Sequence, residues 1–117
     1  MRRAIAGVAV ALLAPAAFAH AFLERAEPRV GSTVAKAPDQ VTLRFSEALE
    51  PAFSTVEVLD AAGKRVDRDD RKVDPANASV MRVSVPALAP GKYRVKWRAL
   101  SADTHVTQGD FTFEVGR

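Results

Sequence analysis

Five segments of the chain alternate apolar and polar residues, the pattern of a β-strand with one buried and one wet face. They cover residues 41–45, 55–58, 81–85, 93–99 and 111–115. Two weaker segments, near residues 21–26 and at Val66, bring the number of predicted strands to about seven. Beyond the first 19 residues no segment has a convincing helical period, so the pattern predicts an all-β protein.

Turn signals separate these segments. Asp60-Ala61-Ala62-Gly63 is typical of a hairpin loop with glycine at positive φ, and Pro90-Gly91 precedes the strand at 93–99. Residues 67–77 are polar and charged and predict an exposed loop. Short strands with regularly spaced turns favour an antiparallel Greek-key β-sandwich of two sheets. A parallel α/β fold is disfavoured because no connection is long enough for a crossover helix.

The first 19 residues have the three parts of a secretory signal peptide. A pair of arginines is followed by an apolar run at 4–13, and Ala17-Phe18-Ala19 places small residues at the cleavage positions. The apolar run is shorter than the roughly 20 residues of a membrane span. We therefore predict cleavage after Ala19, export to the periplasm, and a single mature domain over residues 20–117 that does not span the membrane.

Charge and cysteine content narrow the function. The chain has 17 basic and 14 acidic residues, and two of the basic ones lie in the signal segment, so the mature part is close to neutral. This balance, without any nucleic-acid motif, indicates that nucleic acid is not a partner. There is no cysteine, so no disulfide supports the fold and a metal site must use nitrogen, oxygen or methionine ligands.

The chain has two histidines, and the first, His20, directly follows the predicted cleavage site. After cleavage its α-amine and ring Nδ1 belong to one residue and can close a chelate ring on one metal ion. The reference pKa of an α-amine is about 7.7–8.0, so a metal displaces its proton at small cost near neutral pH. The alternative is that a histidine follows the cleavage site by chance.

The second histidine lies in an Asp-x-His motif, Asp103 to His105, just after the strand at 93–99. An extended backbone would point both side chains to the same side. A turn aspartate beside a surface histidine is the alternative for so short a motif. In a sandwich the first strand and the end of a late strand can meet at one end, which would bring His20 to His105. The resulting three nitrogens and one carboxylate favour copper(II), whereas zinc would prefer a tetrahedral site.

Glu47 is a further candidate, because it follows the strand at 41–45 in Phe45-Ser46-Glu47. Its carboxylate could bind the metal directly or accept a hydrogen bond from one of the metal ligands. A solvated loop acid fits the sequence equally well. The sequence shows no nucleophile with an attendant base and no phosphate-binding loop, so catalytic residues are not predicted.

These residues together resemble the CopC family of periplasmic copper-resistance and copper-trafficking proteins. The resemblance rests on His20, on Leu-Arg-Phe-Ser-Glu at 43–47, and on the run from 91–99 that continues through Ser101-Ala102-Asp103-Thr104-His105 to Gly109. It implies a β-sandwich related to immunoglobulin and cupredoxin folds. It also implies one copper(II) per chain, held by the amine and imidazole of His20, by Asp103 and by His105, with Glu47 close to the metal. An inner-membrane copper permease of the CopD type is the implied partner.

Some members of that family hold copper(I) in a methionine-rich loop with a histidine, but residues 58–73 contain neither residue type. We therefore expect a monomeric copper(II) carrier or buffer in copper resistance and homeostasis, and not an enzyme. Two alternatives belong to other classes. One is a copper monooxygenase-like enzyme with an N-terminal histidine brace. A carboxylate ligand argues against it, because the carboxylate would occupy the position on the metal that oxygen needs. The other is an interaction sandwich without a metal.

Overall fold

A computed structural model describes residues 21–117, so the predicted signal peptide and His20 lie outside the described residues. The described part is built from strands and one short 3₁₀ turn, η1 (Pro51–Phe53). The strands are β1 (Leu23–Glu27), β2 (Thr33–Val34), β3 (Gln40–Phe45), β4 (Thr55–Leu59), β5 (Lys72–Asp74), β6 (Asn77–Ser84), β7 (Gly91–Leu100) and β8 (Val106–Val115). Nowhere in residues 21–117 is there a helix long and apolar enough to cross a membrane.

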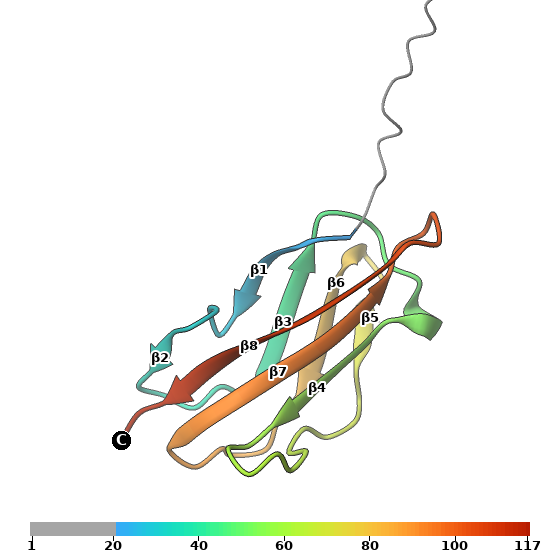
Figure 1. Cartoon of the computed structure of the whole chain (residues 1–117). Coiled ribbons are helices and arrows are strands. Elements are labelled where there is room, and N and C mark those ends of the chain that lie inside the picture. The colour runs from blue at the N-terminus through green and yellow to red at the C-terminus, as the bar shows by residue number, and fades with distance from the viewer. Residues whose placement is uncertain (1–20) are drawn as a thin grey trace, which may run out of the picture.

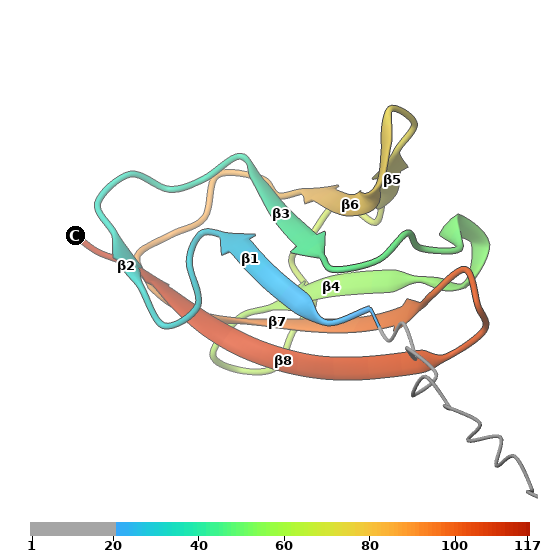
Figure 2. The ribbon, with the colours of Figure 1, turned by 90° about the horizontal axis from the view of Figure 1, so that it is seen from above.

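The strands form two four-stranded sheets that pack face to face (Figures 1 and 2). One sheet has the order β1-β3-β6-β5 and the other the order β2-β8-β7-β4. Neighbouring strands are antiparallel except for the short β2, which pairs with the end of β8 in parallel. Consecutive strands such as β3 and β4 lie in different sheets, as in a Greek-key sandwich. The predicted all-β sandwich is therefore confirmed.

The core lies between the sheets and follows the alternation of the sequence. Along β7, Tyr93, Val95 and Ala99 point inward and are buried, and Trp97 is half-buried against the core. The basic residues between them, Arg94, Lys96 and Arg98, are exposed. The largest fully buried side chains include Phe113, Leu43 and Met81, one from each of β8, β3 and β6. Side chains of a strand alternate between its two faces, so the sequence alternation indicates which face enters the core. The inner strands β3 and β6 depart from it locally, because Thr42 and Val80 are buried as well.

Two details of the sequence prediction were wrong. The segment at 67–77 is not all loop, because β5 lies within it and pairs Val73 with Met81 of β6. An edge strand with little buried surface needs no clean alternation, which is why a polar stretch concealed it. Val66 forms no strand of its own; its amide donates to the carbonyl of Val58 at 2.8 Å, and its side chain packs partly buried against the core.

The loop after β4 turns as the sequence predicts, with Gly63 at a φ of 84°. The chain then folds back over a buried carboxylate, Asp67. This side chain accepts hydrogen bonds from the backbone amides of Val58 at 2.7 Å and Asp69 at 2.9 Å, and from Arg65 Nε at 2.9 Å. Desolvation alone would raise the pKa of Asp67, but the bonds from Arg65 and the two amides outweigh it and leave the pKa below its ordinary value.

We predict that Asp67→Asn lowers the free energy of unfolding by about 2 kcal/mol at pH 7, because it removes a charge-assisted acceptor from three donors. Since the folded pKa of Asp67 is depressed, its contribution is present above the unfolded pKa of about 3.9 and is lost as pH falls through the folded value. Urea unfolding of both proteins from pH 7 to pH 2.5 measures this, and the difference should shrink below about pH 4.

Asp69→Asn is the matched control, because Asp69 pairs with the same Arg65 at 3.0 Å but its side chain is 80% exposed. An exposed pair contributes little, and asparagine tolerates the positive φ of 57° at this position. Equal losses in the two variants, or a loss for Asp67→Asn that stays constant with pH, would contradict the prediction.

Candidate metal site

The Asp-x-His motif lies in the tight loop that joins β7 to β8, not on an extended strand as the sequence suggested. The Ser101 amide donates to the His105 carbonyl at 2.9 Å, and the Thr104 amide donates to the Ser101 carbonyl at 2.9 Å. Thr104 has a φ of 72°, in the left-handed region. The chain reverses direction here because β7 and β8 are adjacent antiparallel strands, so an extended Asp103–His105 segment is incompatible with the hairpin.

The hairpin nevertheless brings the two predicted side chains together. His105 Nδ1 lies 3.2 Å from Asp103 Oδ1, and each side chain is 40% exposed. The same Oδ1 accepts a hydrogen bond from the hydroxyl of Ser101. This bond is the main reason that the pKa of Asp103 lies below its ordinary value; partial desolvation opposes it, and the His105 ring adds to the lowering. The carboxylate is therefore ionised at neutral pH and half open to solvent.

The first described residues are fixed to both sheets beside this loop. Ala21 is fully buried, and its carbonyl accepts a hydrogen bond from Thr107 Oγ1 at 2.7 Å. Phe22 exchanges hydrogen bonds with Ser46: its amide donates to Ser46 Oγ at 2.9 Å, and its carbonyl accepts from the Ser46 amide at 2.8 Å. Figure 1 shows the start of the described chain, the end of β3 and the β7–β8 loop at one end of the sandwich.

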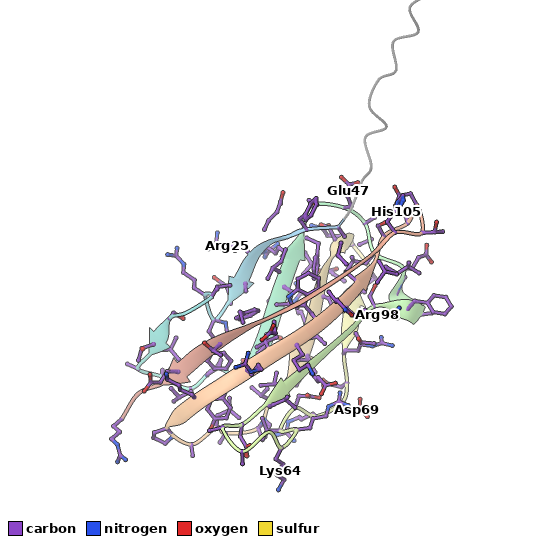
Figure 3. The ribbon with its side chains drawn as sticks, viewed as in Figure 1. Arg25, Glu47, Lys64, Asp69, Arg98 and His105 are labelled. Carbon is purple, nitrogen blue, oxygen red and sulfur yellow. The ribbon has the colours of Figure 1, made fainter. Side chains whose placement is uncertain are left out.

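Glu47 is exposed and lies at the same end of the molecule as His105 (Figure 3). Its segment touches the β7–β8 loop, because the Ala102 amide donates to the Ala48 carbonyl at 3.0 Å and Leu49 forms a bridge with Ser101. Within residues 21–117, however, no three His, Asp or Glu side chains converge as a metal-binding group. The structure thus pairs Asp103 with His105 and leaves Glu47 outside that pair, while His20 is outside the described residues.

Two hydroxyl residues at this site escaped the sequence analysis, Ser101 and Thr107. Ser101 continues the inward-facing series of β7 after Ala99 and is only 1% exposed. A small polar residue at a core position must find a hydrogen-bond partner inside the protein, and that is the signal that could have identified it. Thr107 carries no such signal, because its partner is a backbone carbonyl 86 residues earlier in the chain.

The described residues contain a single thioether, and it is remote from solvent. Met81 of β6 is fully buried among the core residues between the sheets. A sulfur atom in that position is not exposed to an incoming metal ion.

The fold and the site together define a small β-sandwich protein with a histidine and an ionised carboxylate paired at one end. The family model described as the CopC domain matches residues 23–116, and the chain belongs to the CopC family.

Solved structures and a longer relative support this membership. The crystal structure of CopC from Methylosinus trichosporium OB3b is similar with a TM-score of 0.78 and 38% identity, covering 83% of this chain and 94% of that one. PcoC, a methionine-rich copper resistance protein from Escherichia coli, is similar with a TM-score of 0.71 and 36% identity, covering 83% and 99%. The copper transport protein CutJ of Bacillus subtilis is 35% identical over 101 residues, which is 86% of this chain but only 19% of CutJ.

We predict that Thr104→Gly stabilises the protein by about 1 kcal/mol, because a Cβ is unfavourable in the left-handed conformation that the loop imposes. Thr104→Ala is the matched control: it keeps the Cβ and should leave the stability nearly unchanged. Denaturant unfolding of the three proteins decides the matter. Equal stabilities for glycine and alanine would show that the loop does not hold Thr104 at positive φ in solution.

Proposed function

We propose that the chain is a periplasmic copper(II)-binding protein that carries or buffers copper in copper resistance and homeostasis. Its ligands would be the amine and imidazole of His20, released by cleavage after Ala19, together with Asp103 and His105. The observation that carries this proposal is the hydrogen bond from Thr107 Oγ1 to the Ala21 carbonyl. His20 is covalently bonded to Ala21, and Thr107 is two residues from His105, so the bond supports a site that joins the two histidines.

The donor set suits copper(II) better than its competitors. Imidazole and amine nitrogens with one carboxylate oxygen are typical of tetragonal copper(II) sites, and copper(II) heads the affinity order of divalent ions. The Asp103 carboxylate, ionised and 40% exposed, supplies a negative charge where the cation would bind. Glu47, at the same end but outside the pair, would act from further away. One copper(II) per monomer is the stoichiometry that this set supports.

A binding role, and not an enzymatic one, is supported by CutJ and PcoC, which are named for copper transport and copper resistance. CutJ also supports a partner for this chain. The chain corresponds to about a fifth of CutJ, so a domain of this kind is part of a longer copper transport protein there. We propose that this chain exchanges copper with a separate inner-membrane permease of the CopD type.

We predict that one extra glycine in front of His20 weakens copper(II) binding by more than about 100-fold relative to the mature chain that starts at His20. The extra residue removes the free amine of His20 from the chelate. Loss of a group that only supports a metal ligand commonly lowers metal affinity 10–100-fold, so loss of a ligand atom should lower it at least as much. Competition titration with a copper(II) chelator measures the affinities. EPR of the mature protein should show one tetragonal copper(II) per chain with nitrogen hyperfine splitting, and His105→Ala should remove one nitrogen.

A glycine added after Arg117 is the control, since it alters the opposite chain end and should leave the affinity unchanged. Equal affinities for the two N-terminal forms would refute the chelate, and an unchanged EPR spectrum in His105→Ala would place the metal elsewhere.

We predict that the mature protein has no strong copper(I) site. Copper(I) prefers soft sulfur ligands, and the only methionine of the mature part, Met81, is fully buried. Under anaerobic reducing conditions a copper(I) chelator of roughly nanomolar strength should remove the metal completely. Met81→Leu, which conserves volume, should behave as the unaltered protein does. Retention of copper(I) against this chelator would disprove the prediction, and its loss in Met81→Leu would then identify the thioether as the ligand.

A further inference from the structure

We propose that Ser101 is a positioning residue for the metal site: its buried hydroxyl sets the carboxylate of Asp103 in place against His105. The inference rests on the proposed function, because it assigns a role in copper(II) binding. Ser101 does not itself contact the metal in this assignment, since its oxygen is engaged within the loop and it is only 1% exposed.

The Ser101 hydroxyl stands between the two candidate ligands. Ser101 Oγ accepts a hydrogen bond from the His105 amide at 3.2 Å and donates one to Asp103 Oδ1. The His105 carbonyl also lies 3.2 Å from Oγ. A hydroxyl has one proton to donate, and an ionised carboxylate is a stronger acceptor than a neutral carbonyl, so the proton belongs to Asp103. The backbone of one ligand and the side chain of the other are thereby tied to one atom.

This arrangement selects which oxygen of Asp103 is offered to a cation. Oδ1 receives both contacts, the Ser101 hydroxyl and His105 Nδ1 at 3.2 Å. Because both of these contacts go to Oδ1, Oδ2 is the oxygen that the proposal assigns to the metal. Without the hydroxyl, the carboxylate would be free to rotate about its side-chain bonds, and ordering it would reduce the free energy of binding.

The position of Ser101 in the fold makes the hydroxyl rigid. The backbone of Ser101 forms a β-bridge with Leu49 of the neighbouring segment, and the Ser101 amide donates a hydrogen bond to the His105 carbonyl across the hairpin. A hydroxyl fixed on both sides by backbone bonds can orient a flexible carboxylate at an exposed loop, which is how groups beyond the ligands commonly tune a metal site.

A double-mutant cycle tests the inference, with copper(II) alone as the probe and the mature chain that starts at His20. Ser101→Ala should weaken copper(II) binding by about 10-fold, at the lower end of the range for partners of metal ligands. In the Asp103→Ala background, Ser101→Ala should change the affinity by less than about twofold, since the group through which it acts is gone. Ser101→Thr, which keeps the hydroxyl, should restore the affinity and the EPR parameters of the unaltered protein.

Ser54→Ala separates positioning from stability. Ser54 is a buried serine whose Oγ accepts from the Leu100 amide at 3.1 Å, one residue before Ser101, and it contacts neither Asp103 nor His105. Its loss should lower the thermal unfolding temperature while leaving the copper(II) affinity and EPR spectrum unchanged.

The possible results distinguish the two levels of the proposal. Binding that depends on Asp103 but not on Ser101, or an equal loss from Ser101→Ala in both backgrounds, would overturn the positioning role alone. A mature chain whose copper(II) affinity is the same with and without His105 and Asp103 would overturn the proposed function, and the positioning role with it. A loss of affinity in Ser54→Ala equal to that in Ser101→Ala would show a general effect of stability.

Discussion

Ten consecutive residue pairs join β7 and β8, from Gly91 with Val115 to Leu100 with Val106. This ladder determines which residues of both strands face the other sheet, because a slip of one residue would turn every inward side chain outward. Inside it, Trp97 faces Gly109, where a Cβ would lie 2.8 Å from the indole ring. The ring thus lies over the glycine and meets Phe45 of the opposite sheet edge-on, with 5.1 Å between ring centres. One register therefore fixes both the sheet and its contact with the other layer.

The candidate site is a consequence of how this ladder ends. The pairing runs to the last residue of β7, Leu100, and begins at the first residue of β8, Val106. The chain must therefore reverse direction within the few residues between them, which include Asp103 and His105. A tight loop with a residue at positive φ holds the two side chains 3.2 Å apart, closer than an independent surface aspartate and histidine would stay. The other half of the proposed site depends on the same strand, because Thr107 of β8 holds the Ala21 carbonyl.

The sequence predicted the existence of the long strands but not all of their extent or local geometry, since β8 was predicted over 111–115 and spans Val106–Val115. Tyr93, Val95 and Ala99 alternate with exposed residues because one face of β7 is buried, so the alternation in the sequence predicts this strand. The two-residue β2 and the polar β5 bury too little apolar surface to need an alternating pattern in the sequence. Asp103 and His105 were identified by residue type and spacing. The extended backbone expected for them was wrong, and the turn, which was only the alternative, forms instead, because the reversal follows from strand pairing and not from the motif.

Glu47 and Ser101 show that residue type and spacing along the sequence do not define which groups meet at the site. Glu47 was selected by its place after a strand, and the fold puts it at the same end of the molecule as His105 but outside the Asp103–His105 pair (Figure 3). Ser101 was passed over because a serine carries no metal chemistry of its own. Its significance appears only when burial and partners are known: a hydroxyl that is 1% exposed and bonded to a carboxylate and to the backbone of a histidine. Spacing along the chain finds ligands, whereas the groups that orient ligands are defined by packing.

The proposed ligand set also links metal binding to the location of the protein. The α-amine of His20 does not exist before cleavage, since that nitrogen is then part of the peptide bond to Ala19. An amide nitrogen holds its proton far more tightly than an amine with a pKa of about 7.7–8.0, so the proposed chelate would close only in a chain cut after Ala19. The other two proposed ligands, Asp103 and His105, would be too few to hold copper(II) tightly alone. Under the proposed function, strong binding would then begin only after export and would be confined to the periplasm.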